Sequence, residues 1–311
     1  MRYLAGVWVA SLPKEMEGRS VLGVEFVSPE IIDMEIWRPT FSSAYYTPES
    51  ILFKGRIKKP TMNDFHLARM QIEIEETSLD KLMKIAEEVV HPRVKRVCLI
   101  IDATTRTGHV YVSPEVIIRL DGSSFRTWVG SSSGRPQENV NEELLRLMED
   151  VLSKCKDRSF IRRIERALTK WGEAQEEHRD ALKTAKLWSA LDALLQKRGE
   201  PVKATVIRRS IVLAMMKTRE SINLFSTFGW QLSFDQANLD KELKKFLENV
   251  YDVRCRVYHD AEEPSLKIES TLALSSLTQV LILKMAEFAQ RGYTWDEAVR
   301  ELDRRARKKG I

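Results

Sequence analysis

Arg254 and His259 are the residues whose types and spacing best suit chemistry on a phosphodiester. They lie in the decapeptide Tyr251–Asp260, which holds two Arg, two Tyr, two Asp and one His. An imidazole that titrates near neutral pH can move a proton, and a guanidinium can stabilise charge growing on a phosphate. In RNA the 2′-hydroxyl is itself the attacking group, so neither a protein nucleophile nor a metal is required. The pair therefore suits cleavage of RNA to a 2′,3′-cyclic phosphate.

Five neighbours in the same decapeptide complete the candidate site. Two are expected to bind substrate and three to support the pair: substrate-binding Arg256 and Tyr258, and supporting Asp252, Cys255 and Asp260. Residues five apart lie about 140° apart on an ideal α-helix. Arg254 and His259 therefore meet only if the helix ends or bends, or if a second subunit completes the site. The simpler alternatives are a His259 that caps the helix or pairs with Asp260, and a surface ion pair between Asp252 and Arg256.

This segment also resembles the HEPN superfamily, in which an Arg is followed by His after four to six residues, late in a helix of a bundle. Arg254 and His259 have four residues between them. The words LWSALDALLQKRGE (187–200), VIRRSIVLAMM (206–216) and NVYDVRCRVYHD (249–260) are similar in order and spacing to the Apea-like branch. The resemblance covers roughly residues 142–308.

The resemblance implies a helical bundle that forms a homodimer, with both Arg–His pairs facing one cleft. It implies metal-independent RNA cleavage, with His259 as general acid or base and Arg254 as phosphate stabiliser. Toxin, antiphage and RNA-surveillance systems are the expected settings, and an antitoxin or regulatory protein is a further expected partner. Members often carry a polar Asn, Asp or His after the Arg, where this chain has Cys255. A catalytically inactive RNA-binding or dimerisation module is therefore the alternative.

A third interpretation takes His259 and Asp260 as the doublet of a metal-dependent phosphohydrolase. Such a site needs further His and Asp ligands, and the five histidines do not supply a convincing set. The three cysteines lie far apart and form no CxxC unit for zinc. We therefore expect neither a metal nor a cofactor.

Basic residues recur every fourth position at Arg158, Arg162, Arg166 and Lys170. This spacing lines one side of a helix and suits contact with an RNA backbone, although a solvated helix face has the same pattern. Asp192 lies within the apolar run LWSALDALL, where burial would require a partner. We expect Arg208 or Arg209 to supply it.

Length and composition set the broad class. The 311 residues are 43% hydrophobic, with a mean hydropathy of −0.32 and no long uncharged stretch, which favours a cytoplasmic protein of two domains without membrane contact. The net charge is +5, with 18 basic and 18 acidic residues up to Asn141 and 32 and 27 after it. The excess positive charge thus lies in the C-terminal part, which gives a weak indication of nucleic acid.

The period of apolar residues changes along the chain. Residues 1–130 are expected to form an α+β domain of unknown role, with strands over 31–37, 68–76, 96–102, 109–120 and 126–130 and a helix over 78–90. Thr77 and Asp80 match a capping box for that helix, and the His91-Pro92 step is expected to end it. The Gly-, Ser- and Asn-rich segment 131–141 is expected to be a linker.

Residues 142–311 are expected to form an all-α, HEPN-like bundle. Helical periodicity covers 142–155, 159–171, 178–199, 202–216, 239–260, 272–292 and 294–310. Gly199 and Gly292 are placed as C-caps, and Thr294 with Glu297 matches a capping box.

Overall fold

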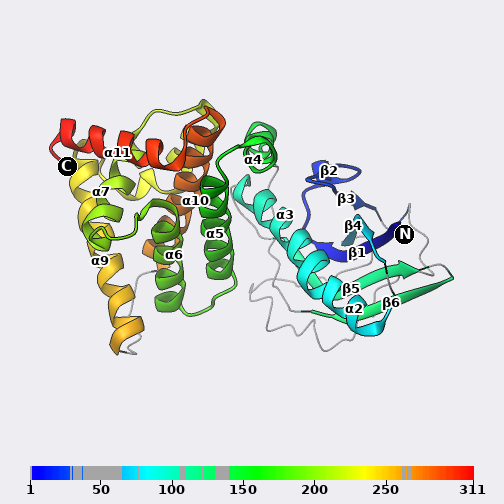
Figure 1. Ribbon diagram of the computed structural model, residues 1–311. Coiled ribbons are helices and arrows are strands. Elements are labelled where there is room, and N and C mark those ends of the chain that lie inside the picture. Colours follow the sequence, from blue (N-terminus) through cyan, green and yellow to red (C-terminus); the bar gives the residue numbers. More distant parts are fainter. Residues whose placement is uncertain are drawn as a thin grey trace. The chain divides into compact units, whose positions relative to one another are not determined.

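The computed structural model describes residues 2–28, 30, 37, 65–75, 77–105, 110–120, 122–129, 140–260, 264 and 268–311 (Figure 1). They form two compact units, Met1–Val140 and Asn141–Ile311. The boundary between them falls at the end of the expected linker segment. The first unit combines a sheet with helix, and the second is helical. The strand expected over 31–37 lies outside the described residues, apart from Trp37, and so does most of the 131–141 segment.

The first unit contains an antiparallel sheet in the order β2-β3-β4-β1-β5-β6. Strand β1 lies between β4 and β5 and pairs with both. The strands expected around 68–76, 109–120 and 126–130 are confirmed as β4, β5 and β6. The sequence pattern does not predict β1. The strands are β1 Arg2–Ala10, β2 Ser20–Val21, β3 Val24–Val27, β4 Phe65–Glu73, β5 Tyr111–Leu120 and β6 Ser123–Trp128.

One core cluster of this unit gathers Trp8, Phe65, Leu67 and Ile117 around Trp37. The Trp8 indole donates a hydrogen bond of 2.7 Å to the Trp37 carbonyl. A Cβ added at Gly6 would stand 2.8 Å from a Leu67 methyl carbon and 2.9 Å from the Trp37 ring. Glycine at this position therefore lets the cluster close over the centre of the sheet.

A continuous helical segment contacts the sheet and corrects two expectations. It consists of α2 (Leu79–Ile85), a π-turn (Ala86–Val90) and α3 (His91–Ala103). The expected stop at His91-Pro92 and the expected strand over 96–102 are therefore wrong. Proline has no N–H for the carbonyl four residues back, and the wider π-turn that precedes Pro92 accommodates this. The uninterrupted apolar run after it is buried, and periodicity alone does not separate such a helix from a strand.

The start of α2 also differs from expectation. Its N-cap is Ser78, and no side chain forms a cap hydrogen bond. The capping box expected from Thr77 and Asp80 is therefore wrong.

The second unit is a bundle in which α10 contacts α4, α5, α6, α7 and α8. Among the described residues, α10 alone has the length and hydropathy of a membrane span, and 89% of its most apolar stretch is buried inside the protein, as in the core helix of a soluble bundle. The helices are α4 Glu142–Lys154, α5 Arg158–Gln175, α6 Asp180–Leu195, α7 Val202–Met215, α8 Glu220–Gly229, α9 Leu239–Cys255, α10 Ile268–Gln290 and α11 Trp295–Lys309.

The seven expected helices are confirmed, and α8 is an addition that the periodicity does not predict. The Thr294 hydroxyl accepts a hydrogen bond from the Glu297 N–H while the Glu297 carboxylate accepts from the Thr294 N–H, so the expected capping box is present. Gly292 has a φ angle of +84° just after the end of α10, as a C-cap glycine does. Gly199, with a φ angle of +87°, is not the C-cap of α6 as expected, because that helix ends at Leu195 with Gln196 as its cap.

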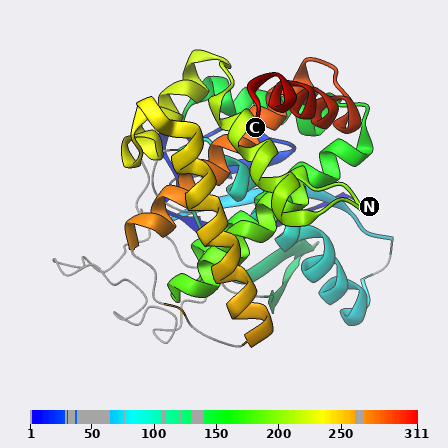
Figure 2. The ribbon, with the colours of Figure 1, turned by 90° about the vertical axis from the view of Figure 1, so that its left-hand side faces the viewer.

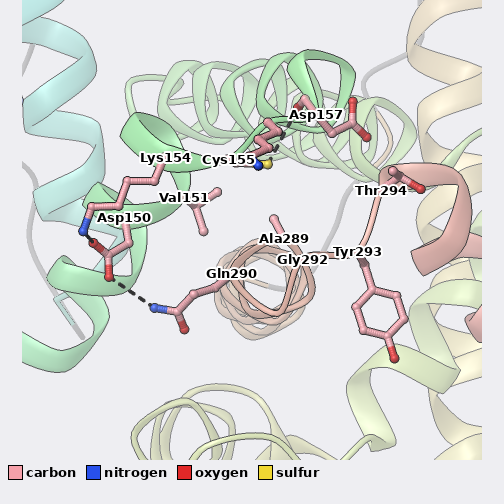
Figure 3. Close-up of a pocket in the computed structure, with 11 residues that line it drawn as sticks. Asp150, Val151, Lys154, Cys155, Asp157, Ala289, Gln290, Gly292, Tyr293 and Thr294 are labelled. Carbon is pink, nitrogen blue, oxygen red and sulfur yellow. Dashed lines mark hydrogen bonds and ion pairs between the residues drawn. The ribbon is translucent and has the colours of Figure 1, made fainter.

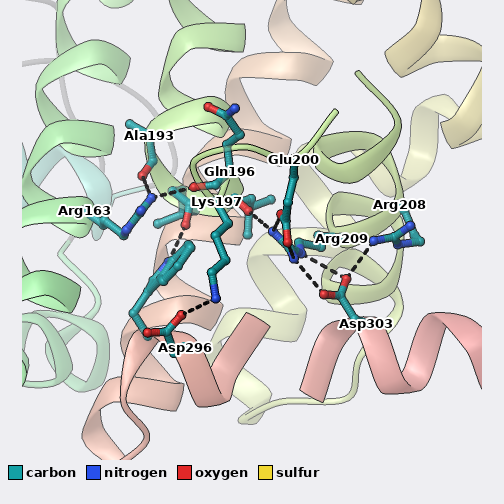
Figure 4. Close-up of polar contacts among 12 residues, drawn as sticks. Arg163, Ala193, Gln196, Lys197, Glu200, Arg208, Arg209, Asp296 and Asp303 are labelled. Carbon is teal, nitrogen blue, oxygen red and sulfur yellow. Dashed lines mark hydrogen bonds and ion pairs between the residues drawn. The ribbon is translucent and has the colours of Figure 1, made fainter. Parts of the chain in front are cut away.

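A polar network ties four helices of the bundle together (Figure 4). The buried Arg209 on α7 pairs with Asp303 on α11 at 2.6 Å and with Glu200 at 2.8 Å, and it donates to the Leu195 carbonyl at the end of α6. Arg163 on α5 donates to two carbonyls at the same end of α6 and stacks 3.5 Å from the Trp295 ring centroid. These contacts fix the positions of α6 and α7, which border the candidate site.

Candidate functional site

The candidate pair lies at the C-terminal end of helix α9, where the α-helix continues into a π-turn. Leu243, Leu247 and Val250 form its buried face, and the chain continues past Cys255 as a π-turn over Arg256–Asp260. In both Figure 1 and Figure 2 the C-terminal end of α9, golden in colour, reaches the lower end of the helical unit. A π-turn closes with hydrogen bonds between residues five apart and so brings such residues toward the same side of the helix. Arg254 lies in the α-helical part before this turn, and His259 lies within the turn.

The guanidinium of Arg254 lies near two aromatic rings. Its Cζ is 6.0 Å from the Tyr251 ring centroid and 5.4 Å from that of Tyr258. Its Nε atom is buried without a hydrogen-bond partner, and the side chain forms no ion pair with any described residue. Cation–π contacts are therefore its closest recorded contacts, and its N–H groups donate no hydrogen bond to a described residue.

Asp192 on α6 is the acidic neighbour of Arg254. Burial raises the pKa of the Asp192 carboxyl to about 6, and the positive charge of Arg254 opposes that rise. The expectation that Arg208 or Arg209 partners Asp192 is wrong, since both arginines bind Asp303 instead. Sequence indicates that Asp192 is partly buried but not that its neighbour comes from α9, because the two positions lie 62 residues apart.

Tyr251 connects α9 to the neighbouring helices. Its ring meets the Trp188 ring of α6 edge to face, with centroids 5.2 Å apart, and the Lys203 ammonium of α7 lies 5.1 Å from its centroid. Lys203 also pairs with Asp252 at 2.9 Å, so Asp252 is engaged by Lys203 and not by Arg256 as the alternative reading expects. Sequence reasoning does not identify Lys203, and its place opposite Tyr251 depends on how α7 packs on α9.

The remaining residues of the decapeptide are arranged around this centre. His259 is exposed and forms no hydrogen bond or ion pair with a described residue, Asp260 and Arg254 included. Tyr258 is 51% exposed, and Arg256 and Asp260 are exposed as well. Cys255 is half-buried, and its hydrogen bond raises the pKa of the Tyr251 hydroxyl, with burial as the second cause. The turn thus presents a histidine and a tyrosine to solvent.

The basic residues of α5 divide into two groups. Arg158, Arg162 and Arg166 are exposed and form no ion pair with any described residue. Lys170, by contrast, pairs with Glu173 at 2.8 Å. The three arginines lie on one face, as their spacing predicts, but no contact joins them to the decapeptide.

A separate cavity of about 480 Å³ lies where α4 and α10 end and α5 and α11 begin (Figure 3). Its polar groups bind one another: Asp150 pairs with Lys154 and accepts a hydrogen bond from Gln290. Asp157 caps the start of α5 and accepts from the Trp295 N–H of α11. These side chains hold helix ends together, so we assign the cavity no chemistry.

Comparisons of the chain with protein-family models, with curated proteins and with solved structures find no match. Within the described residues, no group of three His, Cys, Asp or Glu side chains could hold a metal ion.

Proposed function

We propose that the protein is a metal-independent endoribonuclease of the HEPN type, with Arg254 and His259 as its catalytic residues. The observation that carries this proposal is the state of Arg254, whose guanidinium lies near two tyrosine rings and donates no hydrogen bond to a described residue. Other half-buried arginines of the bundle, such as Arg163 and Arg219, are committed to carbonyls or carboxylates. Arg254 has no such partner among the described residues, so an anionic ligand would suit its guanidinium.

The reaction follows from these two side chains. The imidazole of His259 takes the proton of the 2′-hydroxyl, and the freed oxygen attacks the adjacent phosphorus. The bond from phosphorus to the 5′-oxygen breaks, and that oxygen leaves with a proton from an acid. Arg254 stabilises the charge that grows on the non-bridging oxygens. The products are a 2′,3′-cyclic phosphate and a 5′-hydroxyl.

A homodimer would supply the acid. Two copies that present their π-turns to one cleft would offer one neutral imidazole as base and one protonated imidazole as acid. The exposure of His259 at the end of α9 suits this arrangement, which rests on the resemblance. A cytoplasmic toxin, antiphage or RNA-surveillance role belongs to the same proposal.

The test is cleavage of an end-labelled structured RNA in EDTA. Wild type is expected to give cyclic-phosphate ends. The rate of cleavage should fall about 100-fold or more in His259→Ala and by a similar factor in Arg254→Ala. His178→Ala changes an equally exposed histidine outside the decapeptide and should cleave normally. Normal cleavage by His259→Ala would refute the proposal.

A non-catalytic RNA-binding module is the second candidate. Two observations favour it: Arg254 and His259 form no hydrogen bond with each other, and Cys255 occupies the position where family members often carry a polar residue. RNA that stays intact under saturating wild-type protein, with binding lost in Arg254→Ala, would establish this candidate in place of the nuclease.

A further inference from the structure

Cations and aromatic rings alternate across three elements of the candidate site. Lys203 at the start of α7 lies 5.1 Å from the Tyr251 ring, Arg254 lies 6.0 Å from the same ring, and Arg254 lies 5.4 Å from the Tyr258 ring. We call the row Lys203, Tyr251, Arg254 and Tyr258 the cation–aromatic ladder. The Trp188 ring packs edge to face against Tyr251 and so holds this ring in position.

The two ends of the ladder are open to solvent. Tyr258 is 51% exposed and is among the few large hydrophobic side chains with that exposure in the described part of the chain. The Lys203 side chain is 41% exposed, and its pair with Asp252 has an acid that is itself 57% exposed. Such a surface ion pair contributes little to stability, so Lys203 can exchange Asp252 for another anion at small cost.

Rings that alternate with positive charges match the chemistry of an unpaired nucleic-acid strand. Each base has a π-face that stacks on an aromatic ring, and each phosphate is an anion for a cation beside that ring. In a duplex the bases are stacked on each other, and their faces are not available. Acidic peptides would use Lys203 and Arg254 but would leave the exposed ring of Tyr258 without a role.

We propose that the cation–aromatic ladder binds unpaired RNA beside the scissile phosphate, with a base stacked on Tyr258 at one end and a phosphate further along the strand on Lys203 at the other. The ladder deepens the nuclease proposal, on which it rests for the position of the cut. Tyr251 and Trp188 hold the row in place and are positioning residues. Selection of single-stranded or loop RNA is the consequence.

The test uses a labelled single-stranded DNA oligonucleotide, which has bases and phosphates but no 2′-hydroxyl to attack. Its affinity for the full chain is measured by fluorescence anisotropy at low salt. Tyr258→Ala is expected to weaken binding by about 5- to 150-fold, and Tyr258→Phe by no more than about 3-fold because it keeps the ring. Lys203→Gln should reduce the slope of log affinity against log salt concentration by about 0.7, the value for one lost phosphate contact.

Two variants serve as matched controls. Lys197→Gln removes a lysine whose side chain is 50% exposed and which pairs with Asp296 at 3.1 Å, much as Lys203 pairs with Asp252. Tyr293→Ala removes a tyrosine that is 38% exposed and lies outside the ladder. Both should bind the oligonucleotide as wild type does. The same strand in a duplex should bind more weakly than the single strand.

The outcomes separate this proposal from the nuclease proposal. Wild-type affinity in both Tyr258→Ala and Lys203→Gln would overturn the ladder, even if RNA is cleaved. Wild-type protein that does not bind the oligonucleotide, or binds the duplex equally well, would overturn it too. Binding that depends on the ladder, together with RNA that is never cut, would overturn the nuclease proposal and keep the ladder.

Discussion

Asp192 on α6 and Arg254 on α9 lie near enough for the guanidinium to lower the pKa of the carboxyl, yet they form no ion pair. The Asp192 Oδ1 atom and the Arg254 Nε atom are both buried without a hydrogen-bond partner. Burial outweighs the attraction, and the carboxyl keeps a pKa of about 6. Ionised Asp192 is therefore a cost to the fold at neutral pH that the nearby Arg254 only partly offsets.

Replacing Asp192 with Asn is expected to change how stability depends on pH. The pKa of Asp192 is raised in the folded protein, so its stabilising contribution is present below about pH 4 and is lost as pH rises through 6. At pH 7 Asp192→Asn should unfold with a free energy about 1–3 kcal/mol higher than wild type, and the difference should vanish near pH 4. Urea unfolding followed by circular dichroism across pH 4–7 measures this. A constant difference across the range would contradict the burial argument.

The buried Arg209 should be essential for stability. It holds Asp303, Glu200 and the Leu195 carbonyl, so Arg209→Met leaves Glu200 and the carbonyl without this donor and Asp303 with Arg208 alone. We expect a loss of about 3–5 kcal/mol in the free energy of unfolding, because removal of one partner strands a partly buried charge. Arg208→Met is the matched control: it removes an arginine that shares Asp303 but is 37% exposed, and it should cost less than about 1 kcal/mol.

The spacing of apolar and capping residues within single segments predicts most of the helices of the bundle. It does not predict which segments contact one another. The helices and the Thr294 capping box depend on residues a few positions apart, which sequence displays directly. The strand expected over 96–102 is wrong because this apolar run forms a buried part of α3. An uninterrupted apolar run shows no periodicity that distinguishes a helix from a strand. The sheet order also joins strands that lie far apart in the sequence, such as β1 and β5.

The same division holds at the site. Tyr251–Asp260 is dense enough in functional side chains to be noticed from sequence alone. Lys203, Trp188 and Asp192 enter the site because α6 and α7 pack against α9. Their roles depend on distances between helices, which a single sequence without contacts does not supply.

The arginines of α5 are expected to follow the RNA backbone. Arg158, Arg162 and Arg166 rise one turn apart along an exposed face and have no carboxylate partner among the described residues. Replacing all three with Gln should reduce the slope of log affinity for single-stranded RNA against log salt by about 2, since each phosphate contact contributes about 0.7. Arg304→Gln with Arg305→Gln is the control, because those arginines already pair with Glu301. An unchanged slope would mean that the face is only solvated.

Lys284 in the core of α10 should make the bundle more stable in mild alkali. Its ammonium donates to the Ala214 and Met216 carbonyls at the end of α7, and burial lowers its pKa to about 8, against the opposing charge of Glu287. Because the unfolded chain still binds the proton up to about pH 10.5, the free energy of unfolding should rise between pH 8 and 10 by about 2–3 kcal/mol. Lys284→Met should lack this rise, and the exposed Lys217→Met should keep it. The measurement is urea unfolding at pH 7.5, 8.5 and 9.5. Equal slopes in wild type and Lys284→Met would show that the two carbonyls keep the ammonium charged throughout.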